Sequence, residues 1–290
     1  MQRKLHPLEG IVAMFALFFV LALTIGFAQA EGARAQKTVY LRSSAALVQD
    51  AATDEVVIDK NADSVTPIAS ITKLMTAMVI IDRGLDLDAR IVVSREDVDW
   101  KKGSRSRLEP GTILTRDELL CLALMSSENR AAAALGRTYP GGREAFVAAM
   151  NAKAAAIGMT DSNFVDPTGL SAGNVASARD LAKLVRAAHE YPLIREYSTR
   201  ERHTVNVHGR PLAFRNTNGL VRSTQWEIGL SKTGYISEAG RCLVMHVRLA
   251  SKDLIVVLLD SWGKQSRIGD ANRIKRWLEK NPTLLTLRNG

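Results

Sequence analysis

Residues 68–78 read IASITKLMTAM, an apolar segment with a single lysine one turn after a serine. An α-helix turns once in 3.6 residues, so Ser70 and Lys73 lie one above the other on one helical face, and the Lys73 ammonium can reach the Ser70 hydroxyl. Such a pair can be a nucleophile and its base. It can equally be a helix-capping serine beside a lysine with an apolar stem, so the pair alone decides nothing.

The sequence contains a second S-x-x-K match, Ser261–Lys264, just after a predicted strand in a glycine-containing turn, and this context indicates a loop. Only the first match has partners in order along the chain. Ser127-Glu128-Asn129 follows the apolar run LLCLALM, and Lys232-Thr233-Gly234 lies on a predicted strand. Ordered S-x-x-K, S-x-N and K-T-G motifs are the signature of penicillin-binding proteins and serine β-lactamases.

A resemblance to one family extends beyond these motifs. The segments IASITKLMTAMVIID, LCLALMSSENRAAAALGRTYPGG, MNAKAAAIGMTDSNFVDPTGLS and SKTGYISEAGRCLVM resemble the D-alanyl-D-alanine endopeptidases among the low-molecular-mass penicillin-binding proteins. The resemblance implies an α+β fold of the penicillin-recognising DD-peptidase and β-lactamase type, in which helices flank an antiparallel sheet and an all-helical lobe is inserted. It implies a serine hydrolase that uses no cofactor and no metal.

The resemblance also implies a catalytic role for several side chains. Ser70 is the nucleophile, Lys73 is its general base, and Ser127 passes the proton to the leaving amine. Lys73 must be neutral to accept a proton, and burial beside a second cation, Lys232, lowers the pKa of an ammonium by desolvation and like-charge repulsion. The backbone N–H groups of Ser70 and Tyr235 are the implied oxyanion hole, with Ser70 at a helix N-terminus that favours negative charge.

Substrate binding is implied for the remaining motif residues. Asn129 hydrogen-bonds both the base and the substrate peptide carbonyl, because an amide is donor and acceptor at once. Lys232 and Thr233 hold the substrate carboxylate. Gly234 lets the substrate backbone lie along the strand edge as an added strand. Glu128 is the free position of its motif, and we interpret it as structural or solvated.

One acidic residue tests the β-lactamase alternative. Asp166-Pro167 lies between the second and third motifs, where class A β-lactamases keep the glutamate that activates the deacylating water. Their pattern continues with Leu-Asn, whereas Thr168-Gly169-Leu170 follows here, as in the peptidases. Aspartate is also one methylene shorter, and proton transfer tolerates little misplacement. We therefore expect a long-lived penicilloyl adduct.

The N-terminal 30 residues have the layout of a secretory signal peptide. Two basic residues precede an apolar run over residues 11–27, and an A-x-A site ends at Ala30. The apolar run is close to spanning length, so an uncleaved anchor is the alternative. No later segment stays apolar for about 18 residues, which predicts an exported, periplasmic body with no transmembrane part.

Helix and strand signals separate along the rest of the chain. Residues 46–49 and 56–59 flank a turn-rich stretch and suggest an early hairpin. Thr115 and Ser177 open capping motifs, and Gly158 ends a helix. Strand character returns after about residue 201, first at residues 203–207, and the final helix carries one apolar stripe formed by Ala271, Ile274, Trp277 and Leu278. We expect four parts: a signal peptide (1–30), a flexible lead (31–44), one DD-peptidase domain (45–281) and a tail (282–290). The domain has a sheet lobe (about 45–81 and 201–281) and a helical lobe (about 82–200), with a cleft between the two lobes.

Charge and composition limit the partners. The net charge is +9, and removing Arg3 and Lys4 together with Glu9 leaves +8. A positive exported surface favours anionic wall polymers or lipid headgroups, and nothing resembles a nucleic-acid module. The basic loop Trp100–Gly111 is either a cleft rim that touches acidic stem peptides or solvated charge. Cys121 and Cys242 are expected to be buried free thiols.

The histidines offer no competing chemistry. His203, His208 and His246 lack a zinc spacing such as H-E-x-x-H, and the chain has no G-x-S-x-G elbow, so neither a zinc hydrolase nor a Ser-His-Asp triad is expected. The expected function is hydrolysis of D-alanyl-D-alanine-type bonds in peptidoglycan stem peptides, at D-Ala–diaminopimelate cross-links, with penicillin as a covalent inhibitor. The alternatives are a DD-carboxypeptidase, a β-lactamase, a non-enzymatic β-lactam sensor and a wall-binding scaffold.

Overall fold

The computed structural model describes three stretches of the chain: residues 39–100, 102–249 and 252–282. They form a folded unit that begins at Tyr40. Three expected segments lie wholly or mostly outside the described residues: the signal peptide (1–30), the lead (31–44) and the tail (282–290). Within the described stretches, no helix is both long and apolar enough to cross a membrane.

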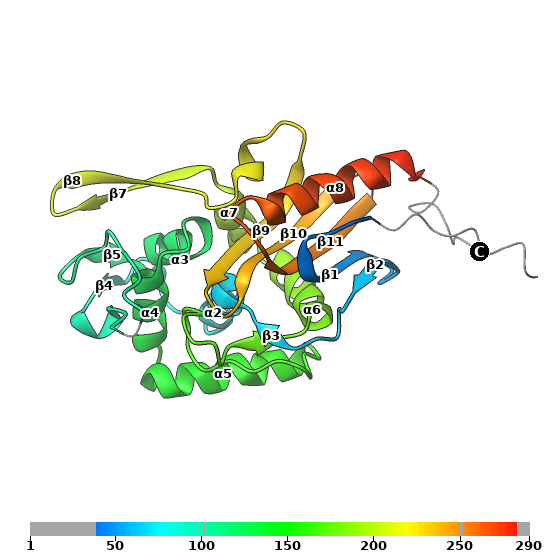
Figure 1. Ribbon diagram of the computed structural model, residues 1–290. Coiled ribbons are helices and arrows are strands. Elements are labelled where there is room, and N and C mark those ends of the chain that lie inside the picture. Colours follow the sequence, from blue (N-terminus) through cyan, green and yellow to red (C-terminus); the bar gives the residue numbers. More distant parts are fainter. Residues whose placement is uncertain (1–38, 101, 250–251, 283–290) are drawn as a thin grey trace, which may run out of the picture. The chain divides into compact units, whose positions relative to one another are not determined.

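A five-stranded antiparallel sheet has the strand order β2-β1-β11-β10-β9 (Figure 1). Its strands are β1 (Ser43–Asp50), β2 (Val56–Lys60), β9 (Glu227–Ile236), β10 (Gly240–Leu249) and β11 (Lys252–Ser261). The early hairpin joins the late strands through β1 and β11, which pair from Ser43 opposite Ser261 to Asp50 opposite Leu254. The sheet therefore closes across the inserted residues, as the sequence predicted.

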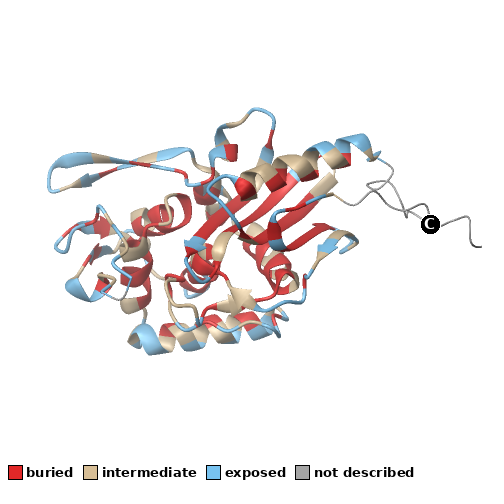
Figure 2. Cartoon of the chain, viewed as in Figure 1, coloured by how far each residue is buried: buried red, intermediate tan, exposed pale blue. Residues whose placement is uncertain are grey.

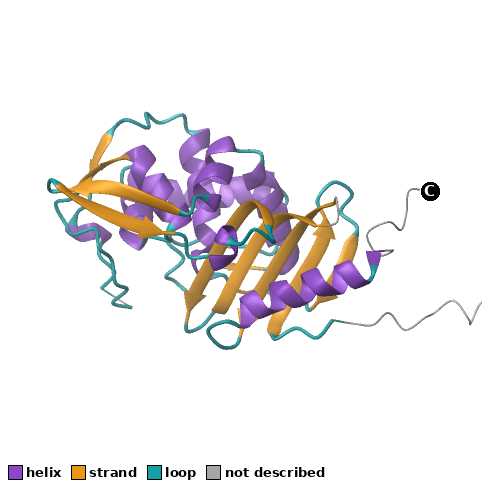
Figure 3. Cartoon of the chain, turned by 90° about the horizontal axis from the view of Figure 1, so that it is seen from above, coloured by secondary structure: helices purple, strands orange, loops and turns teal. Residues whose placement is uncertain are grey.

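Helices cover both faces of this sheet, which explains why its inner strands are apolar on both sides. Helix α8 (Ser266–Lys280) lies on one face and α6 (Ala178–His189) on the other (Figures 1 and 3). The apolar stripe predicted for α8 faces the sheet through the buried residues Ala271, Ile274 and Leu278.

The chain between β2 and β9 contains the remaining described α-helices: α2 (Thr72–Asp82), α3 (Arg116–Met125), α4 (Asn129–Arg137), α5 (Gly142–Ala156) and α7 (Pro192–Thr199). The predicted capping box is present, because the Thr115 side chain accepts from the Glu118 N–H and the Glu118 carboxylate accepts from the Thr115 N–H. The Ser177 hydroxyl caps α6 by accepting from the Asp180 N–H, without the reciprocal bond. The first nine residues of α2 are buried, and Figure 2 shows this helix in the interior.

Short strand pairs accompany these helices. β4 (Arg90–Val92) pairs with β5 (Ile113–Thr115), and β3 (Thr66–Pro67) pairs with β6 (Val175–Ala176). Strands of two or three residues are too short to show an alternating pattern, so the sequence did not predict them. Three 3₁₀ turns complete the unit: η1 (Ala69–Ile71), η2 (Arg95–Asp97) and η3 (Gly219–Arg222).

A separate two-stranded hairpin extends over the helical lobe (Figure 1). It consists of β7 (Arg202–Val207) and β8 (Arg210–Arg215), joined by His208 and Gly209 with φ of 51° and 79°. Two successive positive φ angles are typical of the tight turns that match strand twist. The sequence predicted β7 but missed β8, because a strand with Pro211 and two arginines has a weak strand pattern.

Both cysteines are buried and free, which confirms the expectation for Cys121 and Cys242. Burial raises the pKa of each thiol to about 11. Neither thiol is therefore a reactive thiolate near neutral pH.

A stacked histidine pair predicts sensitivity to acid. The His189 and His246 ring centroids lie 3.7 Å apart at an interplanar angle of 9°. Burial and then the charge of His189 lower the pKa of His246 to about 4; Asp253 opposes this effect, and Arg186 and Arg248 add to it. A lowered folded-state pKa gives stability that is present above the unfolded value of 6.5 and is lost as the pH falls toward 4.

His246→Phe removes this titration and keeps the ring. Between pH 6.5 and 4, we expect wild type to lose about 2–3 kcal/mol more unfolding free energy than the variant. Urea unfolding at several pH values measures the difference. Parallel loss of stability in both proteins contradicts the assignment to His246.

Candidate active site

Ser70 lies in the 3₁₀ turn η1, immediately before α2, rather than within the α-helix itself. The preceding residue, Ala69, has φ of 48°, a conformation that non-glycine residues avoid. Two glycines close on this turn: a Cβ added to Gly169 would lie 1.9 Å from the Ala69 carbonyl oxygen, and one added to Gly234 would lie 2.9 Å from the Ile68 carbonyl oxygen. The backbone around Ser70 is therefore held between a loop and strand β9.

Lys73 is buried and joins the first two motifs. Its Nζ lies 2.9 Å from Ser70 Oγ, 2.8 Å from Asn129 Oδ1 and 2.6 Å from the Thr168 carbonyl oxygen. The one-turn spacing thus brings lysine and serine together as the sequence predicted. The Thr168 carbonyl is a partner that the sequence did not indicate.

Lys232 joins the second and third motifs. Its Nζ donates to Ser127 Oγ at 2.8 Å and to the Thr233 carbonyl oxygen at 3.0 Å. Ser127 has φ of 60°, so the second motif, like the first, contains a residue in an unfavourable backbone conformation. All three motifs consequently meet around Ser70.

Burial gives the two lysines unusual acidity. It lowers the pKa of Lys73 to about 7, although the nearby carboxylates of Asp166 and Glu128 oppose the shift. Burial also lowers the pKa of Lys232 well below its ordinary value, and the positive charges of Lys73 and Arg267 lower it further. A lysine with a pKa near 7 is partly neutral at physiological pH, as a general base requires. The expected like-charge repulsion acts on Lys232, whereas burial is the main cause for Lys73.

The other predicted binding residues lie on β9 beside Ser70. Thr233 Oγ1 lies 2.6 Å from Thr217 Oγ1, and the Tyr235 ring is exposed with the Arg241 guanidinium 4.4 Å from its centroid. The expected reason for a glycine at position 234 was that the substrate backbone lies along the strand edge there. The structure adds a second reason, because a side chain there would press on the backbone of residues 68–70.

Asp166 has a structural role in the loop that contacts Lys73. Its Oδ1 accepts from the Thr168 N–H, the Thr168 hydroxyl and the Gly169 N–H, at 2.6, 2.6 and 2.8 Å. Its Oδ2 accepts from the Ser171 N–H at 2.9 Å. The carboxylate is thus occupied in shaping the loop that presents the Thr168 carbonyl to Lys73. Glu128 is structural as well, since it is buried and caps α4 through the Arg130 N–H.

Arg267 is a site residue that sequence reasoning missed. It lies near the start of α8, and its Nη1 donates to the Gly234 carbonyl oxygen at 3.0 Å. Its Nε is buried with no hydrogen-bond partner among the described residues. This third cation beside Lys232 belongs to no motif, and only the packing of α8 on the sheet brings it to the site.

The second S-x-x-K match and two of the histidines lie away from the three motifs. Ser261 is the last residue of β11, and Lys264 is exposed in the following turn, so this S-x-x-K match forms no pair like that of Ser70 and Lys73. His203 lies beside Arg200, and His208 occupies the hairpin turn. None of these residues contacts the three motifs.

Comparison with known proteins places the chain in a family. Residues 31–263 match the family model described as D-alanyl-D-alanine carboxypeptidase. A D-alanyl-D-alanine endopeptidase of Pseudomonas aeruginosa is 48% identical over 241 residues, which cover 82% of this chain and 78% of that relative. A D-alanyl-D-alanine endopeptidase of Escherichia coli K12 is 43% identical over 274 residues, which cover 92% of this chain and 88% of that relative.

The solved structures agree with this placement. The crystal structure of the Streptomyces K15 DD-transpeptidase matches with a TM-score of 0.76 at 26% identity, over 82% of this chain and 97% of that one. The α+β DD-peptidase fold expected from the sequence is thereby confirmed. The chain therefore belongs to the D-alanyl-D-alanine carboxypeptidase family of serine peptidases.

Proposed function

We propose that this protein hydrolyses D-alanyl-D-alanine-type peptide bonds of peptidoglycan through an acyl-enzyme on Ser70, and that cross-links between stem peptides are its preferred substrate. The observation that carries the proposal is the buried Lys73, whose Nζ lies 2.9 Å from Ser70 Oγ. Its pKa of about 7 makes proton removal from the serine feasible at neutral pH.

Acylation begins when neutral Lys73 takes the Ser70 proton and Ser70 Oγ attacks the scissile carbonyl carbon. The C–N bond then breaks, and the leaving amine receives a proton through Ser127, which is hydrogen-bonded to Lys232. Water hydrolyses the resulting ester and restores the serine. The backbone N–H groups of Ser70 and Tyr235 are the oxyanion hole in this proposal, which supplies the largest electrostatic contribution to acyl transfer.

Two basic side chains, Lys232 and Arg267, favour a substrate with a carboxylate next to the scissile bond. Lys232 is buried beside Thr233, and Arg267 reaches the same strand through the Gly234 carbonyl. An anionic group there would compensate the repulsion between these charges. Its binding would therefore raise the pKa of Lys232 toward the ordinary value. The carboxylate adjoining a D-alanyl-D-alanine-type bond fits this requirement.

The preference for cross-links is supported by the relatives. The two relatives at 43% and 48% identity are both endopeptidases by name. The motif chemistry alone serves an endopeptidase or a carboxypeptidase equally. Relative rates on the two substrates therefore decide between them.

Separate digestion of purified cross-linked dimers and monomeric pentapeptides tests the proposal, with products read by mass spectrometry. We expect dimers to be split faster than terminal D-alanine is released. Faster release from the pentapeptide makes the protein a carboxypeptidase. A β-lactam sensor would hydrolyse neither substrate but still react with penicillin, and a wall-binding scaffold would do none of these.

We also propose that the protein is periplasmic and that β-lactams acylate Ser70. The signal-peptide layout of residues 1–30 supports the location, because the proposed substrate lies outside the cytoplasmic membrane. Penicillin resembles the D-alanyl-D-alanine terminus, so the groups proposed for the substrate serve it as well.

Asp166→Asn separates this peptidase from a β-lactamase. Because the Asp166 carboxylate is occupied by loop N–H groups, we expect the penicilloyl adduct to last minutes or longer in both proteins, with little difference between them. The variant should lose about 1–3 kcal/mol of stability, since an amide nitrogen cannot accept those bonds. Adduct lifetime by intact mass and unfolding by urea are the measurements. Rapid benzylpenicillin turnover that disappears in the variant makes the β-lactamase assignment the better one.

A further inference from the structure

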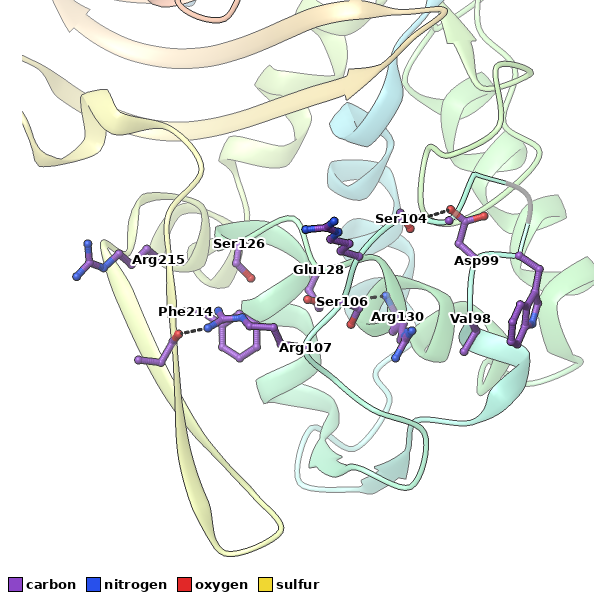
Figure 4. Close-up of a pocket in the computed structure, with 14 residues that line it drawn as sticks. Val98, Asp99, Ser104, Ser106, Arg107, Ser126, Glu128, Arg130, Phe214 and Arg215 are labelled. Carbon is purple, nitrogen blue, oxygen red and sulfur yellow. Dashed lines mark hydrogen bonds between the residues drawn. The ribbon is translucent and has the colours of Figure 1, made fainter.

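Two adjacent cavities lie beside the catalytic motifs and share Val98, Asp99 and Trp100 in their lining. A cavity of about 690 Å³ is lined by Asn129 and Thr168, both partners of Lys73. A larger cavity of about 960 Å³ is lined by Ser126 and Glu128, the two neighbours of Ser127 (Figure 4). Both volumes are within the range of pockets that bind small ligands.

The proposed roles of Asn129 and Ser127 indicate on which side of the scissile bond each cavity lies. Asn129 holds the peptide carbonyl of the acyl part, so the smaller cavity lies on the acyl side. In the proposed mechanism Ser127 passes the proton to the leaving amine, and its neighbours Ser126 and Glu128 line the larger cavity, so this cavity adjoins the leaving-group side. A carboxypeptidase releases only one amino acid there, whereas cleavage of a cross-link releases a whole second peptide.

The larger cavity is rich in positive charge. Four arginines line it: Arg105, Arg107, Arg130 and Arg215. Its two carboxylates, Asp99 and Glu128, already accept hydrogen bonds from backbone N–H groups. The side chains of Arg105 and Arg215 are exposed and make no hydrogen bond or ion pair within the described part of the chain.

The cavity is a built feature rather than a gap between loops. The Arg107 guanidinium lies 4.0 Å from the centroid of the buried Phe214 ring and donates to the Ala213 carbonyl oxygen at 2.8 Å (Figure 4). From α4, Arg130 Nη1 donates to the Leu108 carbonyl oxygen at 2.7 Å, and its buried Nε has no partner among the described residues. These contacts join residues 103–108 to β8 on one side and to α4 on the other.

We propose that this cavity binds the second stem peptide of a cross-link, an acidic peptide that leaves when Ser70 is acylated. The proposal rests on the proposed function and adds a specificity site to it. Carboxylates of the departing peptide pair with Arg105 and Arg130. Each guanidinium group provides the directed hydrogen bonds that a carboxylate accepts. Strand β8 contains none of the three motifs, and in this proposal it forms part of the binding site for the departing peptide.

Arg105→Ala tests the proposal, with Arg276→Ala as the matched control on the exposed side of α8. For each protein, kcat/KM is measured on a purified cross-linked dimer and on a monomeric pentapeptide. We expect the dimer-to-pentapeptide ratio to fall about ten-fold in Arg105→Ala, mainly through KM, and to stay at the wild-type value in the control. A ratio within two-fold of wild type in Arg105→Ala overturns the proposal.

A second substrate tests the charge itself. Amidating the free carboxylates of the departing peptide, except the one next to the scissile bond, should slow wild type on the dimer about ten-fold and slow Arg105→Ala much less. Equal slowing of both proteins places the carboxylates elsewhere and overturns the proposal. Penicillin acylation of the same preparations reports on the nucleophile separately, so failure of the wild-type protein to acylate counts against the proposed function rather than against the cavity.

Discussion

Ser70→Ala is expected to abolish both peptide hydrolysis and covalent labelling by a fluorescent penicillin, with activity reduced about 10⁴-fold or more. The reason is that Ser70 Oγ is the only hydroxyl described within hydrogen-bond distance of the Lys73 amine. Labelling on a gel and dimer hydrolysis by mass spectrometry measure the loss.

Ser261→Ala is the matched control, because Ser261 starts the other S-x-x-K sequence and lies at the end of β11. It should keep full labelling. Full-strength labelling of Ser70→Ala instead removes Ser70 from the role of nucleophile, whatever the behaviour of the control.

Lys73→Arg is expected to reduce acylation about 10³-fold while the fold persists. Arginine keeps the positive charge but cannot deprotonate, so it cannot take the Ser70 proton. In wild type, the acylation rate should rise as the pH increases through about 7, since the neutral form of Lys73 grows over that range. Stopped-flow acylation with a chromogenic cephalosporin across pH measures both effects.

Lys264→Arg is the control for this substitution, since Lys264 is exposed in a turn. Thermal unfolding shows whether the buried arginine is tolerated. An Lys73→Arg variant that remains folded and acylates at nearly the wild-type rate contradicts the assignment of Lys73 as general base.

The sequence predicted those parts of the molecule that depend on local pattern. The one-turn spacing of Ser70 and Lys73, the Thr115 capping box and the stripe of α8 each reflect a periodicity or motif within one element, and the structure contains all three. The meeting of the three motifs followed from their order and from the family resemblance. Their catalytic roles remain predictions until the variants are measured.

Features that depend on packing between distant elements were missed. The Thr168 carbonyl contacts Lys73 as a backbone group, and backbone groups have no residue signature. Arg267 reaches the site only because α8 crosses the sheet. Asp166 looked like a candidate base, but its neighbours supply enough N–H donors to occupy it fully in the loop. Ser70 lies in a 3₁₀ turn because Gly169 and Gly234 confine the backbone there, a constraint that helix periodicity does not contain.

Peptide mapping of the protein after reaction with benzylpenicillin tests the central claim most directly. Trypsin releases residues 61–73, NADSVTPIASITK, which contain both Ser64 and Ser70, so fragment masses must distinguish the two serines. We predict one penicilloyl group, on Ser70, in wild type and none in Ser70→Ala. An adduct on Ser64 or on any other peptide contradicts the account.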